Sequence, residues 1–227
     1  MTYDAFTQRP MTDINSLSNV HSFSSLVTVS GDDGDDMTNR GKSFGILFDV
    51  QTPSGGSGLT SVVISGMDLY LDMTTSKTHY EIWTKGGSWR DVVAVDDENQ
   101  ITDYSVGFRR VSSGHITGGG ASSGLTRIDI GDFEDVRVPV GGYRQAFYVT
   151  LSNDRLVFRS NVGEEGVTIG RPEMLDEDVV QASAVDGSMD VYYGAAVRAY
   201  PLETAVPETD FWYNAGFLGR VWYREEY

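Results

Sequence analysis

Carboxylate and aromatic side chains alternate along two segments that follow each other closely in the sequence. Asp68, Tyr70 and Asp72 are spaced two apart, and Glu81 and Trp83 repeat that spacing. Because alternate residues of an extended strand face the same way, one sheet face could carry all five side chains. Two carboxylates about 5–10 Å apart across a cleft are the machinery of glycoside hydrolysis. A solvated outer face produces the same spacing without any activity, and we favour that interpretation.

Aromatic residues provide a second set of candidates, with 4 Trp, 12 Tyr and 10 Phe in the chain. Rings near strand ends or turns serve as flat platforms for sugars, and protein interfaces are also rich in them. The candidates for ligand binding are Trp83, Trp89, Trp212 and Tyr213. Packing in the core is the competing explanation, and we expect it to account for more than half of the aromatic residues.

An acidic loop bounded by glycines is the candidate metal site. Its ligands would be Asp32, Asp33, Asp35 and Asp36. Such a loop suggests calcium as a cofactor, because hard cations take several carboxylate and carbonyl oxygens from a bent backbone. The spacing is not that of an EF-hand, and the acidic runs at 96–98 and 176–178 are equally plausible. A solvated run of charge is the alternative interpretation for each.

Two other patterns predict no site. His21, His79 and His115 are far apart in the sequence and lack the short spacings of zinc or iron ligands. Residues 120–124 match the G-x-S-x-G pattern of a nucleophile elbow, which needs a strand before it and a helix after it. Glycines precede this match and a strand is expected to follow it, so we interpret it as a chance occurrence.

The structural signal is a series of short segments with a period of two. In the clearest one Gln145, Phe147, Val149 and Leu151 alternate with Ala146, Tyr148 and Thr150. About ten to twelve such strands, separated by turns containing Gly, Asp and Asn, predict an all-β fold. We expect an antiparallel two-sheet β-sandwich of jelly-roll-like topology with little helix. A single domain over 23–227 is expected to follow an N-terminal arm at 1–22.

Composition limits the partners and the location. The 17 basic and 33 acidic residues give a formal net charge of -16, which disfavours nucleic acid and anionic membrane surfaces as partners. No segment approaches the length of a membrane span, so membrane insertion is not expected. The chain has no cysteine, which excludes disulfides and thiolate metal sites. The first residues lack a basic leader and an apolar stretch, so either the protein is not exported by a signal peptide or the sequence is that of a mature or trimmed form.

Five sequence landmarks occur in order between residues 42 and 223. They are Phe48-Asp49-Val50, Tyr80 to Ser88 (YEIWTKGGS), Gln145 to Leu151 (QAFYVTL), Tyr193 to Val197 (YGAAV) with Tyr200-Pro201, and Gly219 to Tyr223 (GRVWY). This order resembles an uncharacterised β domain of diatom and other algal surface or secreted proteins. The resemblance implies a β-sandwich with an adhesive, surface or structural role outside the cell. It implies no catalytic residues, because each landmark is a strand with its turn.

Three functions are compatible with these observations. The first is a non-catalytic structural, surface or assembly module that uses strand edges, the arm and aromatic turns to associate with itself or with other surface proteins. The second is a module that binds polysaccharide and holds structural calcium. The third is a glycan-active hydrolase that uses Asp68, Asp72 or Glu81.

Overall fold

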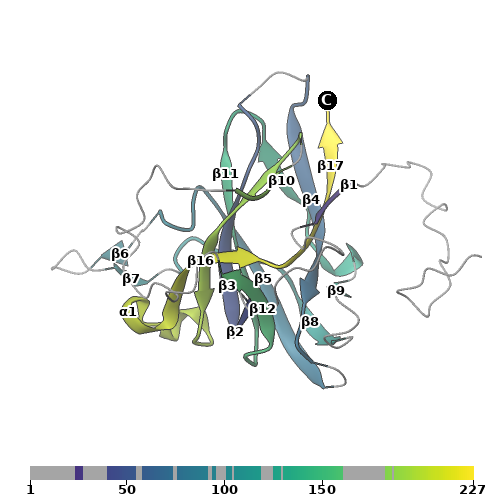
Figure 1. Cartoon of the computed structure of the whole chain (residues 1–227). Coiled ribbons are helices and arrows are strands. Elements are labelled where there is room, and N and C mark those ends of the chain that lie inside the picture. Colours follow the sequence, from purple (N-terminus) through teal and green to yellow (C-terminus); the bar gives the residue numbers. More distant parts are fainter. Residues whose placement is uncertain are drawn as a thin grey trace, which may run out of the picture.

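The computed structural model describes the β domain in two stacked layers (Figure 1). The described residues are 24–27, 40–54, 58–73, 76–91, 94–95, 101–103, 105–118, 125–128, 130–160, 182–185 and 187–227. The two main sheets are antiparallel throughout their named strand pairs, which confirms the predicted β-sandwich. The expected arm at 1–22 lies outside the described residues.

The smaller layer is a five-stranded sheet. Its strands run in the order β1 (Ser24–Val27), β17 (Gly219–Glu226), β4 (Ser61–Tyr70) and β10 (Val136–Pro139), and β9 (Leu125–Arg127) also pairs with β4. The central strand β4 is buried along its whole length. This double burial explains why its sequence, SVVISGMDLY, has an apolar run at its start where a half-exposed strand would alternate.

The larger layer is a ten-stranded sheet. Its main path is β2 (Arg40–Ser43), β12 (Leu156–Ser160), β16 (Phe211–Phe217), β15 (Gly194–Val197), β3 (Gly45–Gln51), β11 (Arg144–Leu151), β5 (Lys77–Gly86) and β8 (Arg109–Thr117). Two more strands extend from β3, namely β14 (Asp190–Tyr192) and β13 (Ala182–Val185). The remaining elements are short: β6 (Ala94–Val95) with β7 (Ile101–Asp103), η3 (Ile130–Asp132), η6 (Leu202–Thr204) and α1 (Pro207–Asp210). No helix among the described residues is long and apolar enough to cross a membrane.

The main core fills the space between the two sheets. On the large sheet it takes the residues that alternate inward along β3 and β11, such as Phe48 and Phe147, whose rings stack with centroids 5.7 Å apart. Phe48 stacks more closely on Phe217 of β16, at 4.6 Å. The small sheet contributes Ile64 and Met67 of β4, which are fully buried. This packing confirms the alternation predicted for 145–151, with Phe147, Val149 and Leu151 facing the main core.

A second apolar cluster covers the opposite face of the large sheet. We call it the outer cluster, and its buried members are Leu47, Trp89, Ala146, Tyr148, Ala195, Val197, Leu202, Phe211 and Tyr213. Most of them alternate with inward residues on the same strands, so β3, β11, β15 and β16 are buried on both faces. The large sheet is therefore an internal layer over much of its area, with loops acting as its outer cover.

One cover is the loop at 87–91, which a buried carboxylate holds in place. Asp49 of β3 is 4% exposed, and its two oxygens accept hydrogen bonds from the Ser88 hydroxyl (2.5 Å) and the Trp89 backbone N–H (2.9 Å). At the far end of the loop, the Asp91 carboxylate accepts the Ser88 N–H at 2.7 Å. These bonds turn Trp89 inward onto Tyr213, with ring centroids 6.2 Å apart.

The landmark segments lie next to one another in this sheet. Four of the five fall on the consecutive strands β15, β3, β11 and β5, and the fifth is on β17 of the small sheet. The hydrogen bond between Asp49 and Ser88 joins two of them directly. Four of the landmark segments therefore build the large sheet and hold its outer cover in place.

The two ends of the large sheet differ in length and in cover. At one end β2 has four residues and carries Lys42, which pairs with Asp72. At the other end β8 has nine residues, and the Phe133–Glu134 segment covers its middle through a bridge to Ser112 and a hydrogen bond to the Val111 carbonyl (2.8 Å). Both ends therefore offer only short stretches of backbone among the described residues.

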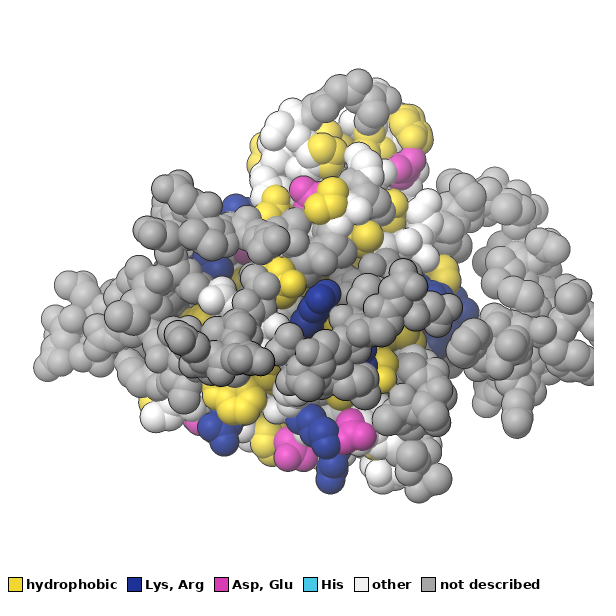
Figure 2. All heavy atoms as spheres, viewed as in Figure 1, with side chains coloured by type: hydrophobic (Ala, Val, Ile, Leu, Met, Phe, Trp, Pro, Cys, Tyr) yellow, Lys and Arg dark blue, Asp and Glu magenta, His cyan; other side chains and the backbone are white. Residues whose placement is uncertain are grey.

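The net charge is unevenly distributed along the chain. All lysines and arginines except Arg9 and Arg171 lie in the described ranges, whereas about half of the 33 acidic residues lie outside them. The described β domain therefore contains nearly equal numbers of basic and acidic residues. On the face seen in Figure 2, basic and acidic side chains lie beside each other.

Replacing Gly194 with alanine is expected to destabilise the protein by about 3 kcal/mol, because the new methyl group meets backbone. A Cβ built at Gly194 lies 1.7 Å from the Leu47 carbonyl oxygen, so β15 and β3 would have to separate. The matched control is Gly187→Ala, where no atom lies within 4 Å of the new Cβ. Urea unfolding of both variants measures the difference, and equal midpoints would contradict the close approach of β15 to β3.

Substitution of Asp49 tests the loop anchor. Asp49→Ala leaves the Ser88 hydroxyl and the Trp89 N–H without their acceptor, so the free energy of unfolding is expected to fall by about 2 kcal/mol. Asp49→Asn keeps an acceptor oxygen and is expected to cost less. Melting curves of both variants give the comparison, and an equal loss would mean that the acceptor is not what the loop needs.

The same carboxyl group predicts a pH dependence. Burial, the largest influence, raises the pKa of Asp49 above 3.8, although Ser88 and the Trp89 N–H act in the opposite direction. The folded protein thus holds this proton more tightly than the unfolded chain, and stability is lost as the pH rises from about 4 through the folded pKa. The stability advantage of the wild type over Asp49→Asn should shrink over this interval.

Candidate functional site

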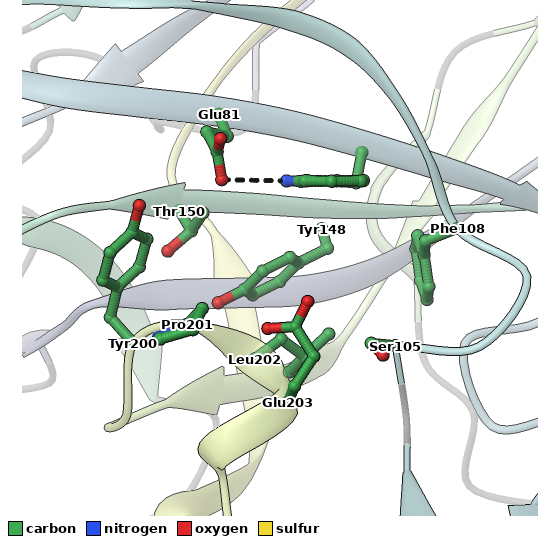
Figure 3. Close-up of a pocket in the computed structure, with 10 residues that line it drawn as sticks. Glu81, Ser105, Phe108, Tyr148, Thr150, Tyr200, Pro201, Leu202 and Glu203 are labelled. Carbon is green, nitrogen blue, oxygen red and sulfur yellow. Dashed lines mark hydrogen bonds between the residues drawn. The ribbon is translucent and has the colours of Figure 1, made fainter.

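A pocket of about 260 Å³ opens on the outer face of the large sheet, beside the outer cluster. Its floor comes from β5 and β11, through Glu81, Trp83, Tyr148 and Thr150. One wall follows β15 and consists of Tyr200, Pro201, Leu202 and Glu203, and the other is formed by Ser105 and Phe108 before β8. Figure 3 shows these side chains converging on one space from four parts of the chain.

Strand register brings the four floor residues together. β5 and β11 are antiparallel neighbours, with Glu81 opposite Thr150 and Trp83 opposite Tyr148. Because the two pairs are two residues apart along each strand, all four side chains point to the same face. The intervening residues Ile82 and Val149 point into the main core. The packing of that core therefore fixes the floor from below.

Glu81 is held from several sides. Its Oε2 accepts the indole N–H of Trp83 at 3.3 Å, the bond marked in Figure 3. Its Oε1 accepts a hydrogen bond from Arg110 Nη1 at 3.1 Å and lies 3.5 Å from His79 Nε2. The Arg110 guanidinium also lies 5.8 Å from the centre of the Trp83 ring. The side chain is only 15% exposed, so the orientation of this carboxylate is fixed before any ligand arrives.

The opposite wall is anchored by Leu202. This side chain is 6% exposed and belongs to the outer cluster, so the short helix η6 is tied to the sheet. The Thr204 hydroxyl donates to the Pro201 carbonyl at 2.7 Å and closes the turn. Glu203 is exposed, and it has no hydrogen-bond or ion-pair partner within the described part of the chain. Its carboxylate is turned toward the Tyr148 side chain (Figure 3).

Tyr148 connects the pocket to the outer cluster. The residue is 3% exposed, and its hydroxyl makes no hydrogen bond of ordinary geometry with any described residue. The neighbouring Thr150 hydroxyl is used elsewhere, since it donates to the Phe44 carbonyl at 3.0 Å. The hydroxyl oxygen itself is buried, and the rest of the pocket lining combines apolar side chains with the polar groups of Glu81, Ser105 and Glu203.

Both tyrosines of the pocket are disfavoured as anions. Burial is the main reason that the pKa of Tyr148 lies well above its usual value, and Glu203, Tyr200 and Glu81 raise it further while Thr150 acts in the opposite direction. The pKa of Tyr200 is raised by burial and then by Glu81 and Glu203. The two carboxylates therefore act on both phenols, which indicates a negative potential in the pocket.

Among the aromatic residues predicted to bind a ligand, Trp83 is in the pocket. Trp89 and Tyr213 are 1% and 2% exposed and stack on each other in the outer cluster, so neither presents a platform to solvent. That part of the prediction is corrected, because the loop anchored by Asp49 buries Trp89. Trp212 is half-buried, with its ring edge against Phe158 (5.7 Å) and the Arg198 guanidinium 4.8 Å away.

The expected shared face for the acidic residues is also corrected. Asp68 lies on β4 of the small sheet and Glu81 on β5 of the large sheet, and each points away from the core between them. Asp68 is not solvated either: it is 4% exposed, accepts the Trp222 indole N–H at 2.9 Å and lies 3.6 Å from Arg220. Burial raises its pKa, whereas an ion pair with Lys42 lowers the pKa of Asp72.

The predicted metal ligands Asp32, Asp33, Asp35 and Asp36 lie outside the described residues, so calcium binding there stays a prediction. The same holds for the other acidic runs and for the G-x-S-x-G match. In the ranges that the structure covers, no group of three or more His, Asp or Glu side chains is arranged to hold a metal. His79 and His115, though distant in sequence, are cross-strand neighbours with ring centroids 5.2 Å apart.

Several pocket residues were not anticipated from the sequence. Tyr148 was predicted only to alternate with the Phe147 and Val149 set, and Tyr200, Glu203 and Phe108 follow or precede strands in irregular segments. One signal was available: Glu81, Trp83, Tyr148, Thr150, Tyr200 and Pro201 all fall within landmark segments. The pocket is where these segments meet.

Comparison with known proteins adds no identification. No protein-family model and no curated protein matches the sequence of this chain.

Removing the Tyr148 hydroxyl is expected to leave stability unchanged within about 0.5 kcal/mol, because no hydrogen bond is lost. Tyr80 provides a matched control: it is buried on the neighbouring strand, and its hydroxyl lies 3.1 Å from Ser112 Oγ. Tyr80→Phe is expected to cost about 1 kcal/mol. Denaturant unfolding of Tyr148→Phe and Tyr80→Phe compares them directly. A larger loss in Tyr148→Phe would show that its hydroxyl is already satisfied.

Proposed function

We propose that this protein is a non-catalytic module that binds a saccharide in the pocket between β5, β11 and the 200–203 segment. The observation that carries the proposal is the combination of Trp83 with an oriented carboxylate, Glu81, at the floor of a small preformed pocket. Sugars expose apolar C–H faces that pack on aromatic rings and hydroxyl groups that donate to carboxylates. The surface or structural role expected from the sequence is compatible with such binding.

The size of the pocket suits one end or one branch of a glycan. Pockets for drug-sized ligands span about 300–1,000 Å³, and this one is slightly smaller, at about 260 Å³. The Ser105 and Thr150 side chains add polar groups beside the aromatic walls. A pocket of this kind favours recognition of a single sugar unit over an extended chain lying along a groove.

Binding is favoured over hydrolysis by the contacts of Glu81. A retaining or inverting glycosidase needs one carboxylate free to attack or to activate water and another to donate a proton. Here both oxygens of Glu81 already accept hydrogen bonds, from Arg110 and from Trp83. The carboxylates considered from the sequence, Asp68 and Asp72, lie on or beside strand β4 of the other sheet. Glu203 is the other carboxylate of the pocket, and the Glu81 that would have to act with it has both oxygens engaged.

Self-association through the arm at 1–22 and structural calcium at 32–36 stay predictions, because those residues lie outside the described part of the chain.

Glycan-array binding, followed by calorimetric titration of the hits, tests the proposal. Trp83→Ala is expected to weaken binding at least tenfold, because the aromatic floor and the hydrogen bond to Glu81 are lost together. Trp212→Ala is the matched control, since that ring packs on Phe158 and Arg198 and does not line the pocket. Circular dichroism confirms that both variants remain folded.

Three outcomes would contradict the proposal. The first is the absence of any glycan hit for the folded wild type. The second is loss of binding in Trp212→Ala with retention in Trp83→Ala, which would move the site. The third is release of reducing ends that stops in Glu81→Gln, which would make the protein a hydrolase.

A further inference from the structure

The pocket contains negative charge without matching positive charge in its lining. Glu81 and Glu203 line it, and no lysine or arginine does among the residues that the structure describes. Two cations lie behind the lining: Arg110 is bonded to Glu81, and Lys85 donates to the Asp91 carbonyl at 2.8 Å with its ammonium group 5.1 Å from the centre of the Phe108 ring. Glu203 has no ion-pair partner among the described residues. The charge of Glu81 is thus largely compensated by Arg110, whereas the charge of Glu203 is available to a ligand.

The uncompensated carboxylate belongs to an aromatic enclosure. Tyr148, Tyr200 and Trp83 line the same space, and Glu203 is turned toward Tyr148 (Figure 3). Aromatic faces attract cations through the negative potential above the ring, and a nearby carboxylate adds to that attraction. The influence of both glutamates on the Tyr148 and Tyr200 phenols indicates that their fields extend across the pocket.

An uncharged ligand would make no use of the Glu203 charge, and an anionic ligand would be repelled by it. Sulfated and uronic acid sugars are therefore poor candidates. A protonated amine on the sugar ring satisfies both features, since the ring packs on the aromatic floor and the ammonium group faces the free carboxylate.

We infer that the pocket recognises an unacetylated amino sugar, with Glu203 and the Tyr148 and Tyr200 rings receiving its ammonium group and Glu81 and Trp83 receiving the sugar ring. The inference rests on the proposed saccharide binding and specifies the class of sugar. Glu81 acts as a fixed acceptor for ring hydroxyls, because Arg110 and Trp83 hold it in place. Glu203 acts as the counter-ion.

Calorimetric titration with glucosamine oligosaccharides and with N-acetylglucosamine oligosaccharides of equal length tests this inference. At a pH where the amine is protonated, the glucosamine series is expected to bind at least tenfold more tightly. The preference should disappear at alkaline pH, where the amine is neutral. It should also weaken as salt is added, because the attraction to an exposed carboxylate is screened.

Glu203→Gln provides the critical variant. It should reduce the glucosamine affinity about tenfold and leave the affinity for the acetylated series unchanged. Asp154→Asn is the charge-matched control, since Asp154 is exposed in the turn between β11 and β12, away from the pocket. This control is expected to bind both series as the wild type does.

Each remaining result overturns the inference in a distinguishable way. Equal affinity for both series would reject the amine and keep saccharide binding. No binding of either series, together with an empty glycan array, would reject both proposals. Equal losses in Glu203→Gln and Asp154→Asn would assign the preference to the overall negative charge of the protein. Equally tight binding of a simple alkylammonium ion would reject the sugar ring as part of the recognised group.

Discussion

The large sheet is buried on both faces, and this double burial determines where the segments around it must lie. A two-layer sandwich needs only one apolar face on each sheet, but β3 and β11 carry apolar side chains on both. The second face has to be covered by segments outside the sheet. The loop at 87–91 and the helix η6 provide that cover, and the buried Asp49 carboxylate and the Leu202 side chain hold them there.

The pocket is a consequence of the same arrangement. It borders the outer cluster, and Tyr148 and Leu202 belong to both. Its aromatic surface is therefore in position because the sheet needs an outer cover, before any ligand contributes. Preorganisation of this kind lowers the entropy cost of binding, since few side chains remain to be ordered. The fixed orientation of Glu81 works in the same direction.

Residue alternation was sufficient to predict a β-sandwich, and the alternating segment at 145–151 coincides with β11. Prediction from alternation failed for β16, because this strand contains a sequence that is typical of a turn. The strand β16 includes Asn214, which has a φ of 59° and sits at a register shift against β15. Asn-Ala-Gly in a sequence indicates a turn, yet here the asparagine adopts a left-handed conformation within a bulge. Trp212 and Tyr213, which were expected near a strand end or a turn, lie inside this strand.

The candidate site was only partly predictable for a related reason. Glu81 and Trp83 have the alternating spacing that marks a shared face, but the spacing does not reveal which strand lies opposite. Register pairs them with Tyr148 and Thr150, while Asp68 and Asp72 belong to the other sheet. The 200–203 wall has no periodic pattern at all. Its place depends on Leu202 entering a cluster whose other members come from four strands and a loop.

The ends of the large sheet bear on how the protein behaves at high concentration. Cross-β growth requires a long, flat row of unpaired backbone groups onto which another chain adds. The strand β2 is too short to provide one, and the Phe133–Glu134 segment occupies the middle of β8, whose first two residues, Arg109 and Arg110, add charge. These two ends of the large sheet are thus poor templates for fibril growth.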